Sequence, residues 1–215
     1  MSIMSWIPIP RTEKKPIEEE DPSIETLLYS GDENPLANWS KFVKAGYIKR
    51  VEDEEVREKV LELIGPCDSV WITTPKDMGE KIGTCFDWLF FIIKPFPYKE
   101  LSIELQVIDN TAKRHGFKFE NKITTTNNRH IFSKIGINMS HGWSLLELDL
   151  QKLVFKCCGA RFAELCCIRI HGSCRVLRVY TTASYVSQDE LPLHYRPCAK
   201  SAFSGAKKHI PMINT

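Results

Sequence analysis

Apolar and polar residues alternate with a period of two through the middle of the chain, and this alternation limits the possible folds more than any other feature. A β-strand sends successive side chains to opposite faces, so an alternating segment buries one face and leaves the other to water or a partner. The segments that show it are 101–107, with Leu101, Ile103, Leu105 and Val107 apolar, and 115–119. Glycine or proline separates nearly every such run. The pattern predicts an all-β fold, an antiparallel β-sandwich with one or two short helices.

One segment has helical instead of strand spacing. Leu150, Leu153 and Val154 form an apolar stripe, preceded by Asp149 and followed by Gly159. An aspartate can accept hydrogen bonds from the first free N–H groups of a helix, and a glycine readily takes the left-handed conformation that ends one. The sequence therefore predicts a short connecting helix between Asp149 and Gly159.

The two ends of the chain differ from its middle in composition and from each other in charge. Residues 11–25 hold three basic and six acidic side chains, whereas 196–215 hold four basic side chains and no acid. Both ends lack periodicity and are rich in proline, small or charged residues, which is typical of extended arms. We therefore expect an amino-terminal arm over 1–25, a β-sandwich domain over 26–196 and a basic carboxyl-terminal arm over 197–215.

Composition limits where the protein can function. No run approaches the roughly 18 apolar residues that a membrane span needs, and the longest, 88–93, fits a fully buried strand. The apolar residues at the amino terminus are interrupted by Pro8 and Pro10, unlike a signal peptide. The expectation is a protein of the cytoplasm, with its eight cysteines kept as free thiols.

Several short motifs, spread over most of the chain, occur in an order and spacing that resemble one known family. The most informative is 170–180 (IHGSCRVLRVY), followed by 185–192 (YVSQDELP). Upstream of it lie Leu28, Tyr29, Ser30, Pro35, Leu36 and Trp39, then 46–50 (GYIKR), 72–75 (ITTP), 92–94 (IIK), 104–109 (ELQVID) and Gly142 with Trp143. Together they resemble the family of cilia- and flagella-associated protein twenty over roughly residues 26–195.

This resemblance implies both a fold and a function. The family fold is a jelly roll similar to carbohydrate-binding modules, and it implies a short helical turn near 53–57 and a strand over 59–64. The implied function is structural and not enzymatic: to bridge proteins of the cytoskeleton at the inner junction of doublet microtubules in the axoneme. The implied partners are α- and β-tubulin and the parkin-coregulated protein. The long amino-terminal extension, the cysteine pairs and the tail depart from the family and suggest a divergent member, such as one specialised for sperm motility.

Tubulin is acidic, so basic side chains are the candidates for contact with it. Neighbouring residues of a strand point to opposite faces, so at least one of Lys49 and Arg50 should be exposed. The candidate partner-binding residues are Lys49, Arg50, Arg175, Arg178, Lys200, Lys207 and Lys208.

The cysteines raise the possibility of a metal site. Cys157, Cys158, Cys166, Cys167 and Cys174 lie close together in sequence, with His171 nearby. Adjacent cysteines on a strand point to opposite faces, and the two-residue gap that lets paired thiolates converge on zinc is missing. We therefore expect core packing, with no metal and no cofactor.

Other functional classes find weaker support. The chain has no glycine-rich phosphate loop, no nucleophile elbow and no paired histidines on a helical turn, so we expect no enzyme. A net charge of only +2 argues against nucleic acid as a partner. A glycan-binding module remains the alternative, and it would need an aromatic platform built from Trp39, Trp71, Trp88 or Trp143.

Overall fold

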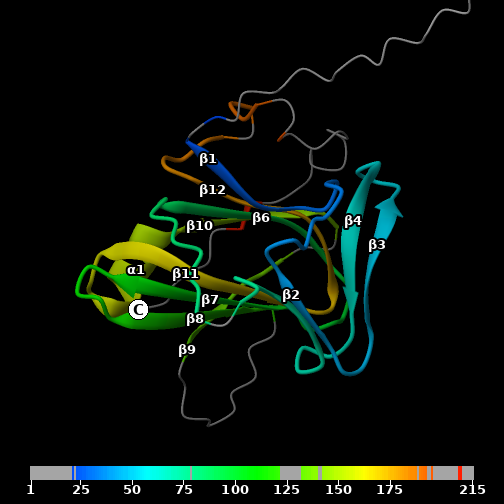
Figure 1. Cartoon of the computed structure of the whole chain (residues 1–215), viewed down its shortest axis with the longest axis horizontal. Coiled ribbons are helices and arrows are strands. Elements are labelled where there is room, and N and C mark those ends of the chain that lie inside the picture. The colour runs from blue at the N-terminus through cyan, green and yellow to red at the C-terminus, as the bar shows by residue number, and fades with distance from the viewer. Residues whose placement is uncertain are drawn as a thin grey trace, which may run out of the picture.

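The computed structural model describes residues 21, 23–77, 79–121, 132–139, 142–187, 189–192, 195 and 208–209. Within them the chain is mostly strand and folds into two stacked sheets with one short α-helix, which confirms the predicted all-β sandwich (Figure 1). The elements are β1 (Ile24–Tyr29), β2 (Ser40–Val43), β3 (Tyr47–Asp53), β4 (Glu58–Ile64), β5 (Val70–Thr74), β6 (Trp88–Pro95), β7 (Ser102–Asp109), β8 (Arg114–Glu120), β9 (Phe132–Gly136), β10 (Ser144–Asp149), α1 (Leu150–Cys158), β11 (Phe162–His171), β12 (Cys174–Thr182) and β13 (Lys208–His209).

The strands divide between two sheets. The first sheet has the order β13-β10-β6-β12-β4-β3, with β1 also paired to β12, and the second has the order β2-β5-β11-β7-β8-β9. Pairing is antiparallel except between β10 and β13 and between β8 and β9. Strands β2 and β3 follow one another in sequence but belong to different sheets, and each is the outermost strand of its sheet. They therefore bring two open sheet edges to the same end of the sandwich (right in Figure 1).

Two apolar clusters hold the fold together. The larger fills the space between the sheets and includes Leu105, Phe117 and Ile170, and the smaller lies on the opposite face of the first sheet. Consecutive residues of β6 serve both clusters, since Phe91 packs in the larger and Phe90 in the smaller. This explains why 88–93 is apolar without alternation: β6 is buried on both faces, as the sequence predicts.

The helix forms as its capping residues predict. The Asp149 carboxylate accepts a hydrogen bond from the backbone N–H of Lys152 at 2.8 Å, and Gly159 ends the helix with φ of 68°. Leu150, Leu153 and Val154 are its buried residues. The short helical turn that the resemblance implies near 53–57 is present as a single turn between β3 and β4, closed by a hydrogen bond with the four-residue spacing of an α-helix, and the implied strand over 59–64 is β4. The backbone N–H of Arg57 donates to the carbonyl of Asp53 at 2.7 Å across this turn.

The predicted arms contain some regular structure. Strand β1 begins at Ile24, and its pairing with Thr182 of β12 places the end of the predicted amino-terminal arm in the first sheet. Strand β13, at 208–209, pairs in parallel with Leu145 and Leu146 of β10. Tyr195 is buried in the smaller cluster, close to the predicted domain end at 196.

Candidate partner-binding surfaces

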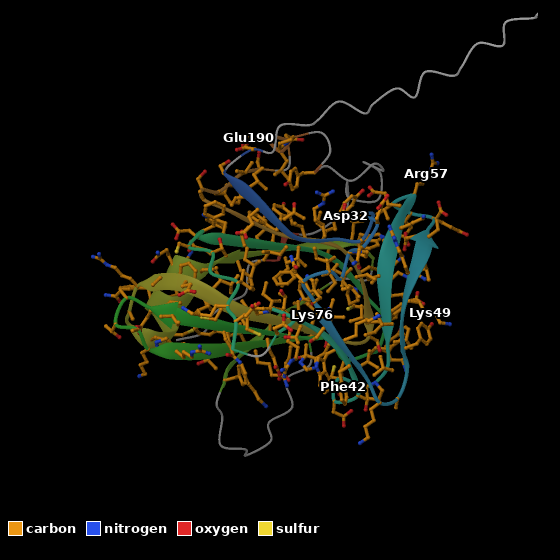
Figure 2. All side chains as sticks on the ribbon, in the orientation of Figure 1. Asp32, Phe42, Lys49, Arg57, Lys76 and Glu190 are labelled. Carbon is orange, nitrogen blue, oxygen red and sulfur yellow. The ribbon has the colours of Figure 1, made fainter. Side chains whose placement is uncertain are left out.

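Residues 41–50 form an exposed, basic stretch along the open edges of both sheets. It includes the second half of β2, the turn and the first half of β3, and it holds four cations and no acid. We call these four side chains, Lys41, Lys44, Lys49 and Arg50, the basic ribbon; all four are exposed. Figure 2 shows Lys49 on the outermost strand of the first sheet and Phe42 on the neighbouring edge of the second.

A glycine makes the sharp passage from β2 to β3 possible. Gly46 has φ of +129°, and a Cβ atom at this position would collide with the carbonyl oxygen of Ile64. A residue with a side chain would therefore be strained there and would push the turn away from β4. The turn keeps the two halves of the basic ribbon next to each other.

Lys49 and Arg50 leave β3 in opposite directions, yet both are exposed, and β3 is the outermost strand of the first sheet among the described residues. The Lys49 ammonium lies 4.5 Å from the centre of the Tyr47 ring, and Tyr47 donates to Glu62 at 2.9 Å. Arg50 donates from Nη2 to the carbonyl of Gly31 at 2.6 Å. Within the part of the chain that the structure describes, neither cation has a carboxylate as an ion-pair partner.

Arg175 and Arg178, predicted as partner contacts, have other roles. The Arg175 guanidinium binds Asp53 and Glu62, so its charge is already matched. Arg178 is only 5% exposed and lies between the rings of Tyr29 and Tyr195, 3.9 Å and 4.7 Å from their centres. It cannot meet a partner while buried there, so the prediction is wrong for Arg178. A β-bulge between Val176 and Arg178 shifts the pairing of β12 with β6 at this point.

The remaining predicted contacts are in the tail. Lys200 and Lys207 lie outside the described residues, and Lys208 begins β13 beside Leu145. Their part in binding stays a prediction.

The outer face of the second sheet carries a polar cluster that the sequence analysis missed. Arg169 of β11 donates to Glu104 of β7 at 3.3 Å, and Lys118 of β8 lies 3.7 Å from the same carboxylate. His171 Nε2 is 3.3 Å from Glu104 Oε1. Burial tends to raise the pKa of Glu104, but the three neighbouring cationic or hydrogen-bonding side chains outweigh it and hold this pKa below its ordinary value. The alternation of polar residues in β7 and β8 was the available signal, but it did not show that β11 would lie beside them.

Beside this cluster lies an aromatic pair. The rings of Phe42 and Trp71 stack with their centres 3.8 Å apart, and the Arg169 guanidinium lies 5.5 Å from the centre of Trp71. The other three candidate tryptophans for a glycan platform lie elsewhere: Trp39 and Trp143 are buried, and Trp88 packs against Phe90 and Tyr185. The four tryptophans do not meet on one face.

The cysteines do not converge on a metal site in the part of the chain that the structure describes. No group of three histidine, cysteine or acidic side chains there has the arrangement of a metal site. Cys166 and Cys174 are buried, as the packing interpretation predicts, whereas Cys157, Cys158 and Cys167 are only partly buried. Burial raises the pKa of the Cys67 thiol to about 11, with a smaller contribution from Glu100. This thiol is 2.9 Å from the carbonyl oxygen of Gly172.

A hollow opens at the end of the sandwich where the β4–β5 turn meets the β6–β7 loop. Its volume is about 530 Å³, and Pro66, Cys67, Phe96, Lys99 and Ser173 are among the residues that line it. Tyr98 of the same loop is almost fully exposed. Among the described residues, no helix has the length and hydropathy that a bilayer crossing requires.

Comparison with known proteins identifies the family. Relatives named cilia- and flagella-associated protein 20 are 31% identical in Paramecium tetraurelia and 30% in Chlamydomonas reinhardtii, each over 172 residues, which is 80% of this chain and 90% of the relative. The relative in Caenorhabditis elegans is 29% identical over 172 residues, 84% of its length. Among solved structures, an exo-beta-agarase matches 77% of this chain and 26% of its own, with 7% identity and a TM-score of 0.43. The model of the CFA20 domain matches residues 19–199, and the chain therefore belongs to the CFA20-domain family.

Proposed function

We propose that the protein is a structural, non-catalytic component of cilia or flagella that attaches to tubulin through the basic ribbon. Its relatives are named for association with cilia and flagella. The observation that carries the proposal is the exposure of four cations, without an acid, along two neighbouring sheet edges. A partner with an acidic surface is the complement of such a stretch, and tubulin is acidic.

The finer assignment follows from the family resemblance. The site of attachment would be the inner junction of doublet microtubules, with α- and β-tubulin and the parkin-coregulated protein as neighbours, in support of ciliary or sperm motility. A rigid sandwich suits this task because a sheet distributes load over many ladder hydrogen bonds. Many modest contacts repeated along a lattice would supply the affinity.

Co-sedimentation with polymerised microtubules at fixed salt tests the proposal. A single exposed ion pair contributes about 0.2–1 kcal/mol, so reversal of Lys49 alone should be nearly silent. Joint reversal of Lys41, Lys44, Lys49 and Arg50 to Glu should weaken binding roughly tenfold or more, because like-charge repulsion replaces four attractions. The loss should be smaller at higher salt.

A charge-matched control separates local contact from net charge. Reversal of the exposed cations Lys113 and Arg114, where β8 begins, and Lys152 and Lys156, on α1, makes the same change in total charge. Figure 1 shows α1 at the end of the sandwich opposite β3. This control should keep most of the binding. Equal loss in both variants, or equal binding of the ribbon variant and the parent, would show that the ribbon is not the contact. Reversal of Lys207 and Lys208 tests the tail separately.

A further inference from the structure

The outer face of the second sheet has the features of a second binding site. Two adjacent cross-strand rows make it up. In the first, Phe42, Trp71 and His171 are register partners across β2, β5 and β11, and Ser102 and Glu120, register partners on β7 and β8, belong to the same face. In the second, Thr73, Arg169, Glu104, Lys118 and Lys134 are register partners across β5, β11, β7, β8 and β9. We call these two rows the polar face.

Several polar atoms on this face are buried without a hydrogen-bond partner. His171 is 7% exposed and Ser102 is 3% exposed, yet His171 Nε2 has only its 3.3 Å approach to Glu104, and Ser102 Oγ makes no hydrogen bond. Arg169 Nε and Glu120 Oε2 are also buried without a hydrogen-bond partner. A buried polar atom without a partner costs about 1–3 kcal/mol, and native proteins contain few of them. Four such atoms on one face leave donors and acceptors that a ligand could pair with.

The other bonds of His171 fix where its unpaired atom points. Its Nδ1 is 2.6 Å from the carbonyl oxygen of Cys67, which anchors the ring from the loop before β5. Nε2 therefore points along the sheet toward Glu104 Oε1, at 3.3 Å but without the geometry of a hydrogen bond. The His171 ring is therefore positioned by the Cys67 carbonyl on one side and by Glu104 on the other, without any ligand.

The charges of the polar face favour an acidic ligand. Its own carboxylates are already matched, Glu104 by Arg169 and Lys118, and Glu120 by Lys118 at 3.1 Å. Three cations, Arg169, Lys118 and Lys134, face these two carboxylates, so one positive charge remains. An incoming carboxylate would also meet the unpaired Arg169 Nε.

The aromatic pair at the border of this face favours a protein ligand over a sugar. Trp71 already stacks on Phe42 and contacts Arg169 and His171, whereas Phe42 is 40% exposed and can receive an apolar side chain. Aromatic and arginine side chains in partly buried positions are typical of the energetic centres of protein interfaces.

We propose that the polar face binds an acidic segment of a second protein, with a carboxylate at Arg169 and a neighbouring aromatic or aliphatic side chain on Phe42. This inference deepens the proposed bridging function, because a bridge needs a second surface apart from the one on tubulin. The basic ribbon and the polar face adjoin at β2, where Lys41 and Lys44 flank Phe42 in sequence, but Arg169, Glu104 and Lys118 lie further into the second sheet, on β11, β7 and β8.

The test uses the full-length protein and three synthetic dodecapeptides. One alternates glutamate with phenylalanine and serine, the second has lysine in place of glutamate, and the third has serine in place of phenylalanine. The first should bind and shift the indole resonance of Trp71 in nitrogen-15 NMR spectra. The lysine peptide should not bind. The peptide without phenylalanine should bind with an affinity that is lower than that of the first peptide by about tenfold or more.

Variants locate the binding. Arg169→Glu should reduce the affinity for the acidic aromatic peptide roughly tenfold or more, and Phe42→Ser, which changes no charge, should reduce it by a similar factor. Arg169→Lys should retain part of the affinity, because it keeps the charge but not the paired N–H groups. Lys152→Glu on α1 is the control for charge and should bind as the parent does.

The opposite results would overturn the proposal. They are equal binding of the lysine peptide, no binding of any peptide, full binding by a folded Arg169→Glu variant, or a Trp71 shift caused instead by neutral oligosaccharides. Microtubule co-sedimentation of Arg169→Glu separates this proposal from the previous one. If peptide binding fails while co-sedimentation persists, only the polar face is wrong; if co-sedimentation of the parent fails while the peptide binds, only the tubulin assignment is wrong.

Discussion

Arg175 of β12 reaches across β4 and donates from Nη1 to Oδ2 of Asp53 on β3 at 2.7 Å. On the way its Nε donates to Glu62 of β4 at 2.7 Å. Asp53 is almost fully buried and also accepts a hydrogen bond from Trp143 Nε1 at 3.2 Å. A single guanidinium therefore ties the edge strand that carries the basic ribbon to the centre of the first sheet.

Arg175→Met should destabilise the fold by about 3 kcal/mol, because it leaves the buried Asp53 carboxylate with only Lys94, at 3.8 Å, as a nearby cation. Urea unfolding at neutral pH measures the loss. The variant that removes both charges, Arg175→Met with Asp53→Asn, should recover part of it. If the double variant loses the sum of the two single changes, the two side chains are not coupled.

The same pair predicts a dependence of stability on pH. Burial tends to raise the pKa of Asp53, but hydrogen bonds from Arg175, Trp143 and the Val56 backbone, with the charge of Lys94, lower it below its ordinary value. A lowered pKa means that the folded state holds the proton less tightly than the unfolded state does. The stabilisation is therefore full above about pH 4, the ordinary value for Asp, and is lost as the pH falls through the lowered pKa.

Unfolding free energies measured between about pH 6 and pH 3 should fall more steeply in the parent than in Asp53→Asn. Glu104 contributes in the same direction, because its pKa is also lowered. Its replacement by Gln gives an independent check on the second sheet. Parallel curves for the parent and Asp53→Asn would contradict the assignment to Asp53.

Tyr195 should be important for stability although it lies far from the central motifs in sequence. It is buried beside Tyr180 in the smaller apolar cluster, and its hydroxyl accepts a hydrogen bond from Thr26 at 2.9 Å. Tyr195→Ala should cost about 3 kcal/mol, as for other large-to-small changes in a core. Tyr195→Phe keeps the ring and loses only the hydrogen bond, so it should cost about 1 kcal/mol. Equal thermal stability of Tyr195→Ala and the parent would show that the cluster does not need this ring.

The thiols should differ in reactivity in the native protein. Cys85 is exposed and should be the fastest described cysteine to react with iodoacetamide at pH 8. Cys67 should react slowly, because a pKa of about 11 leaves about one thiol in a thousand ionised at that pH. Cys174 is buried, and burial raises its pKa further, so it should react only after unfolding. Peptide mass spectrometry over time measures the order, and rapid alkylation of native Cys174 would contradict the packing.

Metal content is a separate prediction. The sequence predicts that the purified protein holds no zinc and that its thiols are all titratable after unfolding. Elemental analysis of the native protein, with unfolding measured before and after addition of a chelator, checks it. Stoichiometric zinc, or loss of structure on chelation, would restore the metal site that cysteine spacing argues against.

Features that depend on neighbouring residues in the chain could be predicted from sequence. The alternation of Leu105 and Val107 gave a strand, and Asp149 and Gly159 gave the ends of a helix, because strand faces and helix caps are set within a few residues. The exposure of at least one of Lys49 and Arg50 belongs to the same class.

The tertiary structure decided which faces are covered and which side chains meet. The sequence suggested that Arg178 would be exposed for contact with a partner. In the structure, Tyr29 and Tyr195, from opposite ends of the domain, enclose its guanidinium. Phe42, Trp71 and His171 become neighbours only because β2, β5 and β11 pair. Period-two alternation shows which residues share a face of one strand, but it holds no information on which distant strand lies beside it or which segment packs above it. The neighbouring strand and the covering segment depend on pairing and burial across the whole chain. The basic ribbon, which is one stretch of sequence, could therefore be predicted in part, whereas the polar face, which several strands build, could not.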